Sequence, residues 1–233
     1  MTNTVRMARN HATQKAPAEP AQPPGSDKAS GRRSSKGVRT RERLVEAAKE
    51  IFEEHGFLDA RITDITERAD QSHGSFYYYF DSKEEVFREI AANVDERLLF
   101  APMDEVIMAQ SRLAPQQRIR EAMRRYFESY RQEARIMGLI EHVSRFDPEI
   151  NALRLARHKR HTEKVAETIR QLQRRKLADS KLDPMVTAAA LGALAYQFAE
   201  IWLGHGAVDC TLEHAVEQVS RIFANAIRLK ESR

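Results

Sequence analysis

The densest run of side chains capable of specific contacts is ADQSHGSFYYYFDSKEEVF, residues 69–87. A tyrosine hydroxyl can bond a phosphate oxygen or a base edge, whereas phenylalanine offers only area to bury. On a helix, Phe76 and Phe80 are spaced i, i+4 and share one face, while the tyrosines sweep around the remainder: Tyr77, Tyr78 and Tyr79. We therefore expect the phenylalanines in the core and the tyrosines facing a wet, anionic groove. The alternative is that all five are core.

No residue pattern typical of an enzyme or metal site appears in the sequence. There is no phosphate-binding Walker loop, no HExxH and no Gly-x-Ser-x-Gly, and Cys210 lacks metal-ligand spacing to His205 and His214. A single cysteine excludes an internal disulfide framework and fits a reducing compartment. The N-terminus has no apolar segment of the kind that export requires. We expect a cytoplasmic protein without cofactor or metal.

The chain divides by composition into a polar start and a long helical remainder. Residues 1–37 are rich in Ala, Pro, Gln and Ser, so we expect a disordered arm. Basic residues gather towards and just beyond its end: Lys28, Arg32, Arg33, Lys36, Arg39, Arg41 and Arg43. The arm is either a solvated tail or a segment that binds nucleic acid.

The helical period begins at residue 40 and continues almost to the end of the 233 residues. Thr40 is the expected N-cap of the first helix and Gly56 its stop. Two short helices follow, separated by residues 70–73, and Ser82 is expected to cap a fourth. No strand pattern appears, so the prediction is an all-α protein of about nine helices. A short helix pair docked by a longer helix describes a helix-turn-helix unit, whose second helix can enter the DNA major groove.

Longer helices are expected beyond Pro102. They cover residues 115–130, a further helix ending near Phe146, 148–175, 184–202 and 212–229, with caps at Asp147, Asp183 and Thr211. The uncharged run at residues 185–199 is shorter than the roughly 17–25 residues that span a bilayer, so we expect a buried or interface helix and no membrane.

The segment GFLDARITDITERADQSHGSFYYYFDSKEEVF resembles the DNA-binding segment of the tetracycline-repressor (TetR) family. The resemblance spans residues 40–87, about a fifth of the chain, and is specific in its second half. It implies a helix-turn-helix DNA-binding domain at residues 38–87 and an effector-binding and dimerisation domain at 88–233. It also implies a homodimer that binds a palindromic double-stranded DNA operator, held by the last two long helices; the alternative for that apolar pair is a monomer core.

The resemblance assigns the DNA contacts residue by residue. Ser75 and Tyr79 would hold phosphates, Tyr77 would contact the backbone and a base edge, Tyr78 would face the groove and Lys83 would contact a phosphate. Thr40, at the start of the first helix, is included in the same set. 

Three positions depart from the family pattern. Asp70 and Gln71 replace the usual Gly-Val of the turn, which Asp tolerates because it adopts left-handed backbone better than most residues. Arg61 replaces the usual Ser or Thr cap of the second helix, and we expect it to bind phosphate instead.

A small, mainly apolar effector is expected among the central helices, in a cavity lined by aromatic and sulfur side chains. The candidates are Met123, Tyr126, Phe127, Tyr130, Met137, Phe198 and Trp202. Arg154, Arg157 and His161 lie on an otherwise apolar arc, where they either pair with Glu141 or Asp147 or meet an anionic ligand head, as of an acyl-CoA.

The function that these observations favour is a ligand-responsive transcriptional repressor. The competing classes are a helical small-molecule-binding protein without operator binding and an enzyme hidden in the divergent half. The basic arm and the segment from Tyr77 to Lys83 argue against both, because neither class needs a phosphate-binding face.

Overall fold

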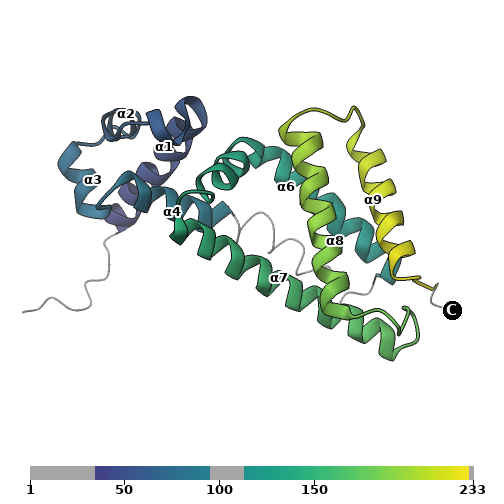
Figure 1. Ribbon diagram of the computed structural model, residues 1–233. Coiled ribbons are helices and arrows are strands. Elements are labelled where there is room, and N and C mark those ends of the chain that lie inside the picture. The colour runs from purple at the N-terminus through teal and green to yellow at the C-terminus, as the bar shows by residue number, and fades with distance from the viewer. Residues whose placement is uncertain (1–34, 95–112, 231–233) are drawn as a thin grey trace, which may run out of the picture.

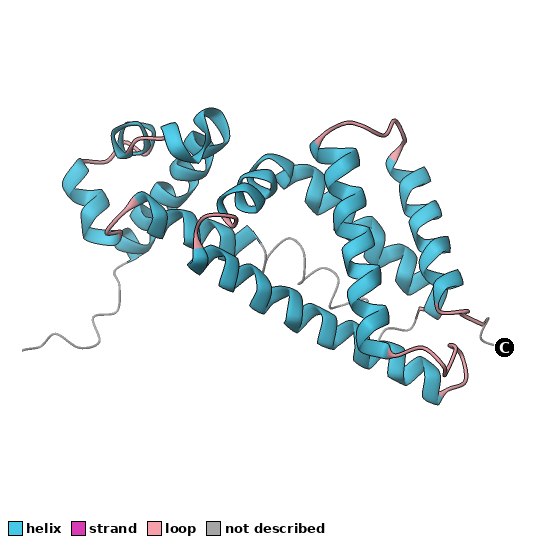
Figure 2. Cartoon of the chain, viewed as in Figure 1, coloured by secondary structure: helices cyan, strands magenta, loops and turns pink. Residues whose placement is uncertain are grey.

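The computed structural model describes residues 35–94 and 113–230, and every regular element within these ranges is helical (Figures 1 and 2). The all-α prediction is confirmed. Most of the arm predicted to be disordered, residues 1–37, lies outside the described residues, but residues 35–37 belong to the first helix.

Four helices form the N-terminal domain: α1 (Ser35–Asp59), α2 (Ile62–Arg68), α3 (His73–Tyr79) and α4 (Lys83–Val94). The predicted apolar face of α1 is buried, at Leu44, Ala47, Ala48, Ile51 and Phe52. Phe52 meets Phe87 of α4 edge-on, with ring centroids 5.2 Å apart, and Phe57 lies 4.8 Å from Phe87. Edge-to-face rings of this kind favour one packing arrangement, so α1 and α4 form a fixed frame for the short pair.

The first helix starts five residues before the predicted cap, so Thr40 lies inside α1 and does not begin it. Lysine and arginine are adequate helix formers, and one glycine, Gly37, costs only about 1 kcal/mol relative to alanine. The polar residues before Thr40 are therefore compatible with a helix, and α1 includes those from Ser35 onward. Gly56 has a φ of 77° and interrupts the helical backbone, as its predicted role requires.

The C-terminal domain consists of α6 (Pro115–Val143), α7 (Pro148–Arg174), α8 (Pro184–Ala199), a π-helical turn η2 (Glu200–Gly204) and α9 (Leu212–Ala226). The side chains of Asp147, Asp183 and Thr211 each accept a backbone N–H at a helix start, which confirms the three predicted caps. α6 packs against α9 and α7 against α8, and α7 runs along one side of the domain (Figure 1).

The two helices predicted over residues 115–146 make up α6, which has a bend between them at Glu133, whose φ and ψ of −116° and 15° leave the helical region. The bend faces the N-terminal domain. The ammonium of Lys49 on α1 lies 2.9 Å from the carboxylate of Glu133, with both side chains largely buried. A second tie joins the domains where Arg88 of α4 pairs with Glu149 of α7.

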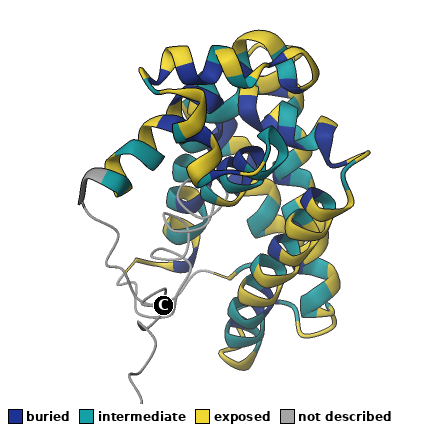
Figure 3. Ribbon diagram, turned by 90° about the vertical axis from the view of Figure 1, so that its left-hand side faces the viewer, coloured by how far each residue is buried: buried dark blue, intermediate teal, exposed yellow. Residues whose placement is uncertain are grey.

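Buried, intermediate and exposed positions are interleaved along the helices (Figure 3). The segment Pro184–Gly204 is long and apolar enough by length and composition to cross a membrane, with a mean hydropathy of 1.3, but only 28% of it is buried inside the chain. Its exposed positions include Val186, Ala189, Ala190 and Ala193. The run is thus longer than the 15-residue stretch suggests, and one side of it is uncovered in the single chain.

Candidate nucleic-acid interface and ligand cavity

Four of the five aromatic residues at positions 76–80 are buried or exposed as their spacing predicts. Phe76 and Phe80 are 0% and 1% exposed, whereas Tyr77 and Tyr78 are 52% and 80% exposed. Tyr79 differs, because it is half-buried and packs against the core. The helix presents its two outward tyrosines together with His73, whose ring lies 5.9 Å from that of Tyr77.

The turn between α2 and α3 closes with the geometry usually made with glycine. Asp70 has a φ of 51°, and its N–H bonds the carbonyl of Glu67 at 3.1 Å. The N–H of Gln71 bonds the carbonyl of Thr66 at 2.9 Å. These two bonds are the Schellman pair that satisfies the last carbonyls of a helix. The expectation that Asp70 would adopt left-handed backbone is confirmed.

Polar contacts fix the start of α3. The hydroxyl of Ser72 accepts the N–H of Ser75 at 3.1 Å, which makes Ser72 the N-cap. The hydroxyl of Ser75 in turn donates to the side-chain oxygen of Gln71 at 3.2 Å. The polar residue at the family's apolar turn position therefore ties the turn to α3. Ser75 is half-buried, and its predicted phosphate contact stays a prediction.

Arg61 occupies the N-cap position of α2 with no side-chain cap, as predicted, and it is exposed. Its guanidinium is therefore available at the helix start, where an anion also meets unsatisfied N–H groups. Arg68 at the other end of α2 is used differently: it bonds Glu50 and Glu54 of α1, each at 2.7 Å. That pairing holds α2 against α1.

Lys83 makes contacts within the chain that the sequence did not predict, and its predicted phosphate contact stays a prediction. Its ammonium donates to the carbonyls of Phe57, Leu58 and Ala60 at 2.9, 2.9 and 3.1 Å. The same group lies 5.0 Å above the ring of Phe57. A lysine ammonium has three donors, and all three are directed at the end of α1. Lys83 thus acts as a cap for α1 contributed by α4, a contact that local sequence could not reveal.

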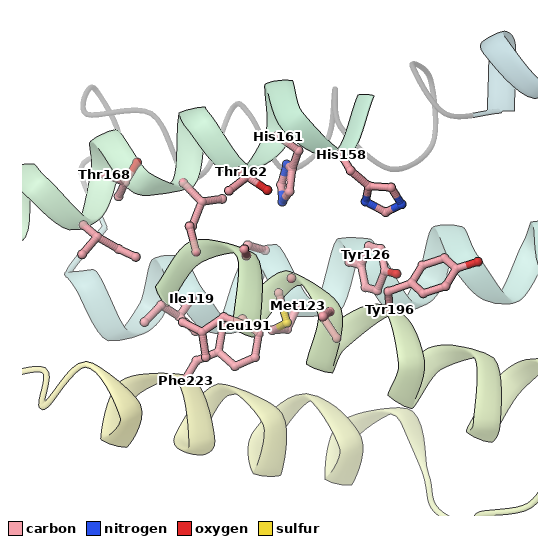
Figure 4. A pocket seen from close by; sticks show the side chains of 18 of the residues that line it. Ile119, Met123, Tyr126, His158, His161, Thr162, Thr168, Leu191, Tyr196 and Phe223 are labelled. Atoms are coloured by element: carbon pink, nitrogen blue, oxygen red, sulfur yellow. The ribbon is translucent and has the colours of Figure 1, made fainter. Parts of the chain in front are cut away.

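A cavity of about 490 Å³ lies between the four helices of the C-terminal domain. Four of the predicted ligand residues line it: Met123, Tyr126, Arg157 and His161. Figure 4 shows three of them, Met123, Tyr126 and His161. Much of the remaining wall is aliphatic or small, from Ile119, Leu172, Leu191 and neighbouring alanines. This volume and lining suit a small, largely apolar ligand.

Five predicted ligand residues do not line this cavity. Phe127, Tyr130, Met137 and Trp202 are buried in the core, and Phe198 packs against them. Phe127 lies 5.5 Å from the ring of Trp202 and 5.7 Å from that of Phe198, on the side of α6 that meets α8 and η2. The prediction was wrong for these five residues because an apolar helix face has the same sequence pattern whether it packs against other helices or lines a cavity.

The sequence-based candidates also missed polar residues of the cavity wall, notably Arg118, His158 and Thr162. Arg154 pairs with Glu141 at 2.7 Å, and the Tyr196 hydroxyl donates to the same carboxylate at 3.0 Å. One of the two predicted partners of the arginines is therefore confirmed, and the other, Asp147, caps α7 instead. His158 could have been predicted as a cavity residue from its position in the basic run of α7, next to Arg157.

Comparison with known proteins first matches the N-terminal part of the chain. Residues 44–90 match the family model of bacterial regulatory proteins, tetR family. The uncharacterized HTH-type transcriptional regulator YdgC of Bacillus subtilis is 42% identical over 64 residues, which cover 28% of this chain and 33% of YdgC. The chain thus matches only about a third of that relative's length.

A longer match reaches the C-terminal domain. The HTH-type transcriptional regulator UidR of Escherichia coli is 26% identical over 160 residues, covering 67% of this chain and 78% of UidR. Among solved structures, Salmonella enterica GusR superposes with a TM-score of 0.69 at 16% identity, over 84% of this chain and 99% of GusR. SmeT, the repressor of the Stenotrophomonas maltophilia efflux pump SmeDEF, superposes with a TM-score of 0.66 at 19% identity. The superposition covers 82% of this chain and 90% of SmeT. At these identities the solved structures establish the shared fold. Together with the family-model match over residues 44–90 and the longer match to UidR, they support a transcriptional regulator of the tetR family.

Proposed function

We propose that the protein is a homodimeric repressor that binds a palindromic operator through α3 and releases it when a small, largely apolar ligand occupies the cavity. The observation that carries the proposal is the division of α3, which buries Phe76 and Phe80 and exposes Tyr77 and Tyr78. A helix that served only the core would be expected to bury its aromatic rings, but Tyr77 and Tyr78 are exposed to water. A DNA-reading helix needs hydroxyls on that side.

The DNA-binding face combines α3 with exposed cations around it. Tyr77 and Tyr78 provide hydroxyls, Arg61 lies at the start of α2, and Arg39 and Arg43 are exposed on α1. The basic residues before position 35 would extend this face along the phosphate backbone. In this arrangement the cations supply affinity and α3 supplies sequence preference.

A second copy of the chain would cover the exposed apolar sides of α8 and α9. Val186 is 69% exposed and Ile222 is 47% exposed, and the alanines between them leave room for close helix approach. Two such pairs would pack as a four-helix bundle. The dimer would place two α3 helices at once on the two halves of an operator.

Ligand and DNA would be coupled through the helices that line the cavity. α6 is tied to α1 by Lys49 and Glu133, and α7 is tied to α4 by Arg88 and Glu149. A ligand that prefers one spacing of α6 and α7 therefore shifts the spacing of the two DNA-binding domains. By linkage, the operator must weaken ligand binding by the same factor.

The test is selection of bound DNA from a random pool, followed by fluorescence anisotropy with the selected sequence. Tyr77→Ala should weaken specific binding by about tenfold, the loss of roughly one good contact, and leave binding to unrelated DNA almost unchanged. Leu153→Ala, which removes an exposed apolar side chain from the other domain, is the matched control. Tyr77→Ala binding the selected DNA as tightly as the parent would refute the assignment of α3.

The dimer is tested separately by light scattering coupled to gel filtration. Ile222→Glu places a charge on the exposed side of α9 and should give a monomer that still folds. Leu153→Glu, an equivalent charge on α7, should remain dimeric. A dimeric Ile222→Glu protein would show that this side of α9 is not the interface.

A further inference from the structure

The cavity is chemically asymmetric along its length. One end, called the basic end here, is formed by Arg154, Arg157, His158 and His161 of α7, facing Tyr126 and Tyr196. Figure 4 shows His158 beside the two tyrosines, with Ile119 and Phe223 at the opposite end. The described residues that line the cavity include no aspartate or glutamate. A ligand therefore meets two arginines and two histidines at the basic end, whereas the opposite end carries hydrocarbon and one arginine, Arg118.

The arginines of the basic end are held in different ways. Arg154 is fixed by Glu141, which stands behind the cavity wall and also receives the hydroxyl of Tyr196. Arg157 is 4% exposed, so its guanidinium is withdrawn from bulk water while it lines the cavity. Two guanidinium groups one helical turn apart, at i and i+3, lie on the same side of α7.

Burial lowers the pKa values of two basic groups at the basic end, Arg157 and His158. Desolvation lowers the pKa of Arg157 to about 10, with Tyr196 opposing and Arg160 adding to the shift. Desolvation, then Arg157 and Arg154, lower the pKa of His158 to about 4. A bound anion would favour the charged forms of all these groups, whereas a neutral or cationic ligand would not.

We propose that the cavity binds an amphipathic monoanion, a straight-chain carboxylate of medium length, with its carboxylate against Arg154 and Arg157 and its chain directed towards Ile119 and Phe223. The planar guanidinium matches a carboxylate through two parallel hydrogen bonds. A single anionic head suits an end with one pair of arginines, and an apolar chain suits the rest of the wall. This inference rests on the proposed function, since the same cavity would hold the effector.

The experiment is isothermal titration of the full chain with octanoate, decanoate and dodecanoate, each below its micelle concentration. Affinity should rise about fourfold for each added methylene, the effect of burying one methylene group. Dodecanol and dodecylammonium should bind at least tenfold more weakly than dodecanoate, because neither can use the guanidinium pair.

Variants locate the head group. Arg157→Gln should weaken dodecanoate binding by about tenfold or more and dodecanol binding by less than threefold. Arg154→Gln should act in the same direction, and it provides a second test if Arg157→Gln fails to fold. Lys159→Gln removes an exposed charge from the same helix outside the cavity wall and should change nothing.

Several results would overturn the proposal. They are equal binding of dodecanol and dodecanoate, unchanged binding by both arginine variants, loss of binding in Arg118→Gln instead, or binding of dodecanoyl-CoA at least tenfold tighter than dodecanoate. Failure of the proposed function looks different: dodecanoate would bind as described but leave the anisotropy of the protein–DNA complex unchanged.

Discussion

Replacing Lys83 with methionine should destabilise the N-terminal domain without changing the number of phosphates it contacts. The ammonium donates to three carbonyls at the end of α1. A hydrogen bond from a charged group contributes about 1.5–3 kcal/mol when formed singly. The carbonyl of Leu58 is in an exposed contact and methionine keeps the buried stem, so we expect a net loss of about 2–3 kcal/mol rather than three full bonds.

Urea unfolding followed by circular dichroism measures the first part of this prediction. With a slope of about 2 kcal/mol per molar urea, the midpoint should fall by about 1–1.5 M. Lys181→Met removes an exposed lysine at the far end of the C-terminal domain and should leave the midpoint in place.

The salt dependence of DNA binding measures the second part. Each phosphate contact contributes about 0.9 to the slope of log K against log salt concentration. Lys83→Met should keep the slope of the parent, whereas Arg61→Met should reduce it by about 0.9 for each copy bound. An unchanged urea midpoint together with a reduced slope for Lys83→Met would show that Lys83 binds phosphate and that the capping argument is wrong.

Three further perturbations follow from the same geometry. Asp70→Val puts a β-branched residue at a φ of 51° and should cost about 1–2 kcal/mol in urea unfolding, while Asp70→Gly should match or exceed the parent; equal stability of the two variants would contradict the strained turn. Lys49→Met leaves the largely buried carboxylate of Glu133 without its ammonium and should cost about 2 kcal/mol, a loss that Lys49→Met with Glu133→Gln should largely recover. The pKa of His158 is lowered to about 4 from 6.5, first by burial, so its contribution to stability is present above pH 6.5 and is lost as the pH falls towards 4. His158→Gln should therefore lose about 1 kcal/mol less unfolding free energy than the parent between pH 7 and pH 5, allowing for partial exposure; parallel losses in the two proteins would exclude His158 as the source.

The hydrophobic periodicity of the sequence predicted most of the helices, and it predicted which aromatic side chains at positions 76–80 are buried. Phe76 and Phe80 are spaced by one turn of helix, so their burial follows from periodicity once the helix forms. Caps at Asp147, Asp183 and Thr211 are local hydrogen bonds between neighbours in sequence, and they were read correctly for that reason. The early start of α1 was missed because a helix can continue through polar residues that offer no stop signal.

Contacts between distant segments were beyond the reach of the sequence. Lys83 lies 23 to 26 residues from the carbonyls it caps, and Lys49 meets Glu133 across the two domains. The same holds for the cavity: Met123 and Tyr126 line it, but Phe127, one residue on, is buried among Phe198 and Trp202. Side chains of adjacent helical residues point about 100° apart, so neighbours in sequence can face different surroundings. The hydrophobic pattern identified α6 as a helix that faces inward, but it could not distinguish residues that line the cavity from residues buried in the core. The sequence by itself determined the helices, the family resemblance and the exposed tyrosines, because these depend on local spacing. Only the tertiary structure decided which lysine caps a helix and where the cavity and its basic end lie, because those depend on which faces of remote helices meet.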